Sequence, residues 1–226
     1  MWKELVARGH RVGKERVRRR MPKHGIRARC KRQFVVTSDS KHHLPIASDL
    51  LQRNFSPSAP NQVWTGDITY IATDEGWLYL AAVIDLFSRQ VVGWSMQPHM
   101  QSMSGDRCFE MAWFRRHPAP GLIFRSDRGS QYCGHGFQDS LKGYKMNSSI
   151  SRKGNCWNNA PTESLWGRLK VGRLNGQKFA TRREAMDEVT DWLMFYNHRR
   201  LHSTLGYVSP LEFEKSWDAA QLLKVA

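Results

Sequence analysis

The stretch VWTGDITYIATDEGWLYLAAVIDLFSRQVVGWSM, residues 63–96, alternates apolar runs with turn signals. Its first run, 63–72, is rich in β-branched and aromatic residues, which favour strands. The second run, 77–85, is almost continuously apolar and predicts a more deeply buried strand. After a further turn, residues 90–96 predict a third strand. This stretch therefore predicts a meander of three strands.

The residues after the meander change to a helical period and then alternate. The expected elements are a helix at 103–117, a strand at 122–127, a helix at 135–144, a strand at 146–151, and helices from 160, at 181–198 and at 209–214. This order predicts an α/β protein with a mixed five-stranded sheet flanked by helices. The same order matches the ribonuclease-H-like fold.

The start of the chain is strongly basic. Residues 1–34 hold 13 Lys and Arg against 2 Asp and Glu, a net +11, whereas the remaining residues hold 22 against 18, a net +4. Two short helices, at 2–8 and at 14–21 before Pro22, are expected around a glycine turn. They indicate either part of a helix-turn-helix or a basic amphipathic helix without groove recognition. The clustered charge favours an arm that binds phosphates.

The composition divides the chain into four parts and excludes several classes of protein. We expect a basic segment (1–34), a linker (35–60), a core with trailing helices (61–216) and a tail (217–226). The four cysteines are far apart and form no C-x-x-C pair, which argues against a structural zinc site or a disulfide framework and fits a reducing cytoplasm. We expect no signal peptide, no membrane span and no ATP-binding phosphate loop.

Three carboxylates fall on three of the expected elements. Asp67 lies inside the first strand, Asp127 ends the fourth strand, and Glu163 begins the helix from 160. In a ribonuclease-H-like sheet the first and fourth strands are neighbours, so a helix beside them would bring all three carboxylates to one edge. Clustered carboxylates repel one another, and hard divalent cations such as Mg²⁺ would relieve the repulsion. Two such ions can activate a nucleophile and stabilise a leaving oxygen at phosphorus.

Each of these residues also has a structural interpretation. Asp67 could cap a bulge or pair with a buried arginine. Asp127 could bond to the backbone of its own turn, and Glu163 could favour the helix dipole. Lys170 follows Glu163 by seven residues, about two turns, and so shares its face, but it could be an ordinary surface residue. The residues alone leave both interpretations open.

The spacing and the flanking words carry a resemblance to a known family. Between Asp127 and Glu163 lie 35 residues, which resembles the D,D(35)E pattern of the retroviral integrase superfamily. The words PNQVWTGDITYI, YLAAVIDLFSRQVVGW, FRSDRGSQY, SRKGNCWNNAPTES and FYNHRRLHSTLGYVSPLEFE resemble the integrase-core transposase encoded by the second reading frame of bacterial insertion sequences. The resemblance covers residues 60–214.

The resemblance implies a DNA transposase that cleaves transposon ends and joins them to target DNA. Asp67, Asp127 and Glu163 would be its catalytic residues and would hold two Mg²⁺ or Mn²⁺ ions. Water and then a DNA 3′-hydroxyl would be the nucleophile, without a covalent protein–DNA intermediate. The residues expected to contact DNA phosphates are Lys170, Arg152, Lys153, Lys14, Arg18 and Arg19.

The same comparison sets expectations for partners and for other residues. We expect double-stranded DNA, a homo-multimer in a synaptic complex and a first-frame DNA-binding protein, in the cytoplasm of a bacterium at its nucleoid. The short basic start suggests a truncated DNA-binding region, and Asn158 stands where the family usually has Asp. Asp85 ends a strand and should be structural, and His198 and His202 should pack or contact DNA because no third metal ligand is nearby. A ribonuclease-H-like nuclease and an inactive DNA-binding regulator remain alternatives.

Overall fold

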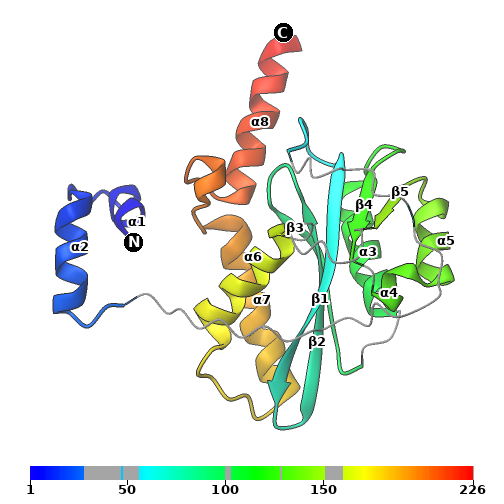
Figure 1. Cartoon of the computed structure of the whole chain (residues 1–226). Helices are drawn as coiled ribbons and strands as arrows, with labels where there is room; N and C mark the ends of the chain where they lie inside the picture. The colour runs from blue at the N-terminus through cyan, green and yellow to red at the C-terminus, as the bar shows by residue number, and fades with distance from the viewer. Residues whose placement is uncertain (28–46, 48–55, 100–102, 128, 151–159, 226) are drawn as a thin grey trace.

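A mixed five-stranded sheet forms the centre of the molecule (Figure 1). The computed structural model describes residues 1–27, 47, 56–99, 103–127, 129–150 and 160–225. Its strands are β1 (Val63–Thr73), β2 (Gly76–Asp85), β3 (Val91–Gln97), β4 (Ile123–Ser126) and β5 (Asn147–Ile150). They are ordered β3-β2-β1-β4-β5, with β1, β2 and β3 antiparallel and β4 parallel to both β1 and β5. The expected meander and mixed sheet are confirmed.

Helices cover both faces of this sheet (Figure 1). The α-helices are α1 (Trp2–Ala7), α2 (Lys14–Lys23), α3 (Met103–Arg116), α4 (Ser130–Cys133), α5 (His135–Gly143), α6 (Ala160–Leu169), α7 (Arg182–His198) and α8 (Pro210–Val225). A π-helix (Lys170–Leu174) continues α6, and a 3₁₀ turn (Ser203–Leu205) precedes α8. Helices α6 and α7 pack on one face, and α3 and α5 pack on the other. None of the helices in the described residues is long and apolar enough to cross a membrane.

The strand β2 supplies both hydrophobic cores because successive side chains point to opposite faces. Leu80 and Ile84 belong to the core under α6 and α7. Ala81 and Val83 belong to the core under α3 and α5. All four are buried, as the nearly continuous apolar run predicted.

A glycine lets α3 lie directly on β3. A Cβ atom on Gly93 would come within 2.3 Å of the Cys108 carbonyl oxygen and 2.8 Å of the Ala112 backbone nitrogen. Both of those atoms are helix backbone, which cannot move aside cheaply. The close packing of α3 therefore depends on the missing side chain at this position.

The structure differs from the expected elements in four places. Helix α2 does not end before Pro22 but continues to Lys23. Pro22 has no N–H to donate to the Arg18 carbonyl, and because it lies in the last turn the helix ends one residue later, at Lys23. Helix α8 extends to Val225, through the residues that we set apart as a tail, and projects away from the sheet (Figure 1). The short α4 and the π-helix have no clear periodic signal and were not expected.

Asp85 has the structural role expected of it. Its buried carboxylate accepts hydrogen bonds from the backbone N–H groups of Asn61 (2.7 Å) and Phe87 (2.8 Å). The Arg116 guanidinium lies 3.7 Å away and also pairs with Glu214. This network ties the end of β2 to α3 and α8.

Asn197 joins α7 to β3 by two hydrogen bonds. Its side-chain Oδ1 accepts from the Val91 N–H, and its Nδ2 donates to the Val91 C=O, each at 2.9 Å. The amide is buried, so it satisfies a backbone donor and a backbone acceptor that water reaches poorly.

We predict that Asn197→Ala lowers the free energy of unfolding by about 2 kcal/mol, because two buried backbone groups lose their partners. Urea denaturation followed by circular dichroism would measure the change. Asn175→Ala, at an exposed position, is the matched control and should change stability little. Equal stabilities of the two variants would contradict the role given to Asn197.

Candidate active site

Strands β1 and β4 bring two carboxylates together. The last pair in their parallel ladder is Thr65 with Arg125. Continuing that register by two residues places Asp67 beside Asp127, the residue that follows β4. Residues in register on parallel neighbours share a face, with the strands about 4.8 Å apart. The two aspartates therefore lie side by side where β4 ends.

The carboxylate of Asp67 is held by three hydrogen-bond donors. Its Oδ1 accepts from the Ile68 N–H at 2.8 Å, and its Oδ2 accepts from the Trp166 Nε1–H at 3.0 Å. The Thr162 side chain makes a further hydrogen bond to it. Burial nevertheless raises the pKa of Asp67 to about 7, with the negative charge of Asp127 as the second cause. The site therefore favours the protonated form of Asp67 more than a solvated carboxyl would.

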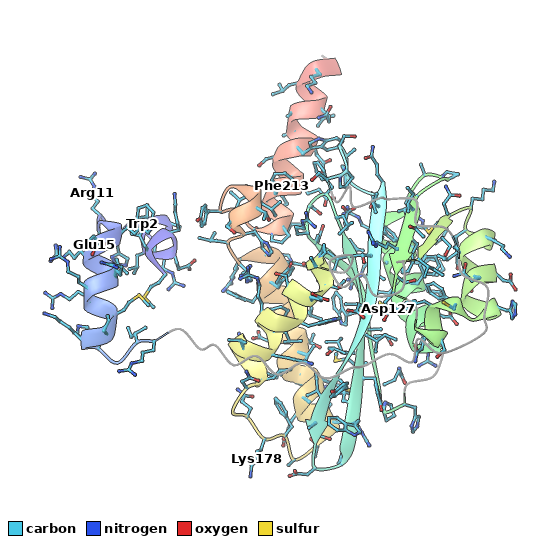
Figure 2. All side chains as sticks on the ribbon, viewed as in Figure 1. Trp2, Arg11, Glu15, Asp127, Lys178 and Phe213 are labelled. Atoms are coloured by element: carbon cyan, nitrogen blue, oxygen red, sulfur yellow. The ribbon has the colours of Figure 1, made fainter. Side chains whose placement is uncertain are left out.

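Asp127 lies in the middle of the molecule next to β1 (Figure 2). Its Oδ1 accepts a hydrogen bond from the Gly129 N–H at 2.9 Å. This is the turn bond that we considered as the structural interpretation of this residue. This turn bond orients the Asp127 carboxylate. Asp127 still lies close to Asp67, because its negative charge raises the pKa of Asp67.

Glu163 is exposed on the first turn of α6. Its neighbour Thr162 and the following Trp166 lie on the buried side of the helix and contact Asp67. One residue along a helix changes the direction of a side chain by about 100°. Within the described part of the chain, no three His, Cys, Asp or Glu side chains gather closely enough to hold a metal ion. The structure thus brings Asp67 and Asp127 together but does not add Glu163 to the pair.

Lys170 lies close to the carboxylate pair. Its Nζ is 5.1 Å from the centre of the Tyr70 ring on β1. Burial lowers the pKa of Lys170, and the charge of Asp67 opposes that shift. A half-buried ammonium beside a carboxylate can contact an anionic substrate there.

The predicted DNA contacts on α2 lie apart from this site. Lys14, Arg18 and Arg19 are exposed on α2, where Arg18 pairs with Glu15 at 2.7 Å. Arg152, Lys153 and Asn158 lie outside the described residues. His198 is exposed and His202 is buried.

Three residues near the pair were not identified from the sequence. Thr162 and Trp166 contact Asp67, and the buried Tyr132 of α4 lies close to both aspartates. Burial, followed by the charge of Asp67, raises the pKa of the Tyr132 hydroxyl, which therefore stays neutral. One signal in the sequence could have identified Thr162 and Trp166. They lie four residues apart, Lys170 follows after four more, and residues with this spacing share one side of a helix.

The donor atoms fit a hard divalent cation. Two carboxylates in register supply oxygen ligands, which Mg²⁺ prefers. A cation between them would favour the charged form of both and so offset the raised pKa of Asp67. Trp166 and Ile68 fix the carboxylate in one orientation, as outer partners of metal ligands commonly do.

Comparison with known proteins agrees with this geometry. Two family models described as integrase core domain match residues 57–156 and 144–210. Among solved structures, the HTLV-2 integrase catalytic core domain in complex with magnesium aligns over 70% of this chain and 98% of its own, with a TM-score of 0.55 and 18% identity. A simian T-cell lymphotropic virus intasome chain aligns over 84% of this chain and 62% of its own, with a TM-score of 0.59 and 17% identity. At these identities the likeness concerns the fold, which is that of retroviral integrase cores.

Curated relatives are much more similar in sequence. An insertion element IS600 31 kDa protein of Shigella sonnei is 41% identical over 95% of this chain and 79% of its own length. The transposase InsF for insertion sequence IS3A of Escherichia coli K12 is 42% identical over 93% of this chain and 74% of its own length. The chain therefore belongs to the integrase core domain family, in the branch that holds these insertion-sequence proteins.

Proposed function

We propose that the protein is a DNA transposase that cleaves the ends of an insertion sequence and joins them to target DNA. The observation that carries the proposal is the pair Asp67 and Asp127, set in register by β1 and β4 and faced by α6. The identity to an insertion-sequence transposase over most of the chain supports the same reaction. Polynucleotidyl transfer is the class of chemistry that this family carries out.

We assign Asp67, Asp127 and Glu163 as the catalytic carboxylates, which would hold two Mg²⁺ or Mn²⁺ ions. The bound ions would activate the nucleophile and stabilise the leaving oxygen at phosphorus. Glu163 is the third ligand in this proposal because it adjoins Thr162, which already touches Asp67. A rotation of the exposed Glu163 side chain, or of the first turn of α6, would bring it to the pair.

The remaining polar residues of the site have supporting roles in this proposal. Trp166 holds one oxygen of Asp67 in place, as an outer partner of a metal ligand would. Lys170 contacts a phosphate of the bound DNA end. Arg152 and Lys153, and Lys14, Arg18 and Arg19 of α2, supply further phosphate contacts.

The partners follow from the reaction. Double-stranded DNA supplies both the element ends and the target, and the net charge of +15 suits a polyanion. Joining two ends requires that they are held together, so we expect a homo-multimer, assisted by a first-frame DNA-binding protein. A bacterial cytoplasm, at the nucleoid, is where such a protein would act.

We predict that Asp127→Asn abolishes cleavage and strand transfer but retains DNA binding. The loss should exceed ~100-fold, the upper range for removing an outer partner of a metal site. A labelled duplex carrying the element's own end, incubated with and without Mg²⁺, would measure joined products. Asp139→Asn, on exposed α5, is the control and should keep full activity.

The outcomes of this assay separate the candidate functions. Joined products that require Mg²⁺ and vanish with Asp127→Asn support the transposase. Cleavage without joining would indicate a nuclease, and binding without cleavage, even with a first-frame protein added, would indicate a regulator. Full activity of Asp127→Asn would overturn the assignment of the site.

We predict that Asp67→Asn stabilises the metal-free protein at pH 8. The folded pKa of Asp67 is about 7, above the value of about 4 for an unfolded aspartate, so its contribution to stability is present below pH 4 and is lost as the pH rises through 7. In EDTA the variant should melt above the wild type at pH 8, with a smaller difference at pH 5. Added Mg²⁺ should raise the melting temperature of the wild type only, and equal Mg²⁺ shifts in both proteins would refute the metal site.

We predict that Trp166→Phe weakens Mg²⁺ binding by roughly 10–100-fold, because it removes an outer hydrogen bond to a metal ligand. The Mg²⁺ concentration that gives half of the thermal shift measures this effect without relying on activity. Trp217→Phe removes an indole from α8 and should leave that concentration unchanged. A lower melting temperature with the wild-type Mg²⁺ dependence would show that Trp166 serves packing alone.

A further inference from the structure

A cavity of about 470 Å³ lies between the α6–π-helix segment and α7, which run next to each other on one face of the sheet (Figure 1). Its walls include Arg168, Arg173 and Arg200, with the aromatic rings of Trp192 and Phe195. No function described above uses this cavity. Its lining combines the two kinds of side chain that hold nucleic acid, cations for phosphates and rings for bases.

Among the residues that the structure describes, two of the three arginines have no acidic partner. Arg173 forms ion pairs with Glu188 (3.1 Å) and Asp191 (3.0 Å). Arg168 instead donates to the Ser164 hydroxyl at 3.3 Å. Arg200 donates to the Leu201 carbonyl at 3.4 Å, and neither of these two lies in an ion pair within the described residues.

A buried histidine adds an unused polar atom to this cluster. His202 is 9% exposed, and its Nε2 has no hydrogen-bond partner in the part of the chain that the structure describes. Its ring stands edge-on to Tyr196, with the centres 5.0 Å apart, and the Arg200 guanidinium lies 5.8 Å from the centre of that same Tyr196 ring. This histidine therefore lies behind Arg200, on the same aromatic ring, and adds no acidic partner to it.

The electrostatics of this cluster favour an anionic ligand. Burial, followed by the charges of Arg200, Arg168 and Arg89, lowers the pKa of His202 to about 4. Burial lowers the pKa of Arg200 as well, and Arg168 adds to that shift. An anion between these like charges would relieve their repulsion, and guanidinium groups match phosphate geometry.

The site is separate from the carboxylate pair. Lys170 faces Tyr70 on β1, whereas Arg168 lines the cavity beside α7. Two residues along a helix turn the side chain by about 200°, so the two cations lie on opposite flanks of the same segment. A DNA strand held at Arg168 and Arg200 would therefore run along a different surface from the strand at Asp67.

We propose that Arg168 and Arg200 form a second DNA-binding site, which holds a phosphodiester of a DNA strand outside the carboxylate pair, with Phe195 beside it for an unstacked base. The proposal rests on the proposed function, which makes DNA the substrate. Phe195 is 39% exposed at the edge of the cavity, where a base could reach it. A small inorganic anion would share the phosphate chemistry but would leave this ring unused.

The test is the salt dependence of duplex binding, measured in EDTA by fluorescence anisotropy at a series of KCl concentrations. Each phosphate contact contributes roughly 0.9 to the slope of log K against log salt concentration. The double variant Arg168→Gln/Arg200→Gln should lower the slope by about 1–2, and Arg168→Gln, an exposed position, should lower it by about 1. Arg183→Gln, an exposed arginine of α7 paired with Asp187, is the matched control and should leave the slope unchanged.

Inorganic phosphate provides the second arm. If phosphate stabilises the wild type against heat and this effect is lost in the double variant while its DNA slope is unchanged, the site binds a free anion and the proposal is overturned. An unchanged slope in the folded Arg168→Gln variant overturns it as well. Strand transfer by the wild type is measured in a separate assay. If that assay fails while the arginine variants still lower the salt slope, the proposed function is rejected and this site is retained.

Discussion

Strand β4 pairs in parallel with β1. Two parallel neighbours in a sheet cannot be joined by a tight hairpin and need a crossover connection. The connection that leads into β4 contains α3. The crossover covers one face of the sheet, and the returning helices α6 and α7 cover the other. Asp67 therefore lies on a strand with helices packed on both sides, beside the end of β4. Its burial, its contact with α6 and its proximity to Asp127 all follow from this one pairing.

Much of the fold could be predicted from the sequence because the signals are local. The alternating pattern of β1, the apolar run of β2 and the helical period of α3 each depend on a few neighbouring residues. The pairing of Asp67 with Asp127 was also predictable, because it needs only the strand order and the place where β4 ends. What could not be predicted depends on contacts across the sheet: the bonds from Trp166 to Asp67 and from Asn197 to Val91 join residues far apart in the chain. The exposed position of Glu163 depends on the rotation of α6, which residue spacing does not fix.

Helix α6 and its π-helical extension separate two clusters of like charge with opposite sign. Negative charge meets at Asp67 and Asp127, and positive charge meets at Arg168 and Arg200. Each cluster lowers the stability of the folded protein, because burial and repulsion both disfavour the charged forms of its side chains. Each would be stabilised by what it binds, a metal ion in the first case and a phosphate in the second. Binding of both proposed ligands would therefore couple to the stability of the protein through one helix that contacts both clusters.

The Asn197 amide has a consequence for how copies of the chain meet. β3 is an edge strand. The outer N–H and C=O groups of an edge strand can form hydrogen bonds with a strand from another molecule. At Val91 both groups are already engaged by a side chain from α7, so strand addition there would first have to displace it. The side chain of Asn197 therefore blocks strand addition at this one position of the edge strand.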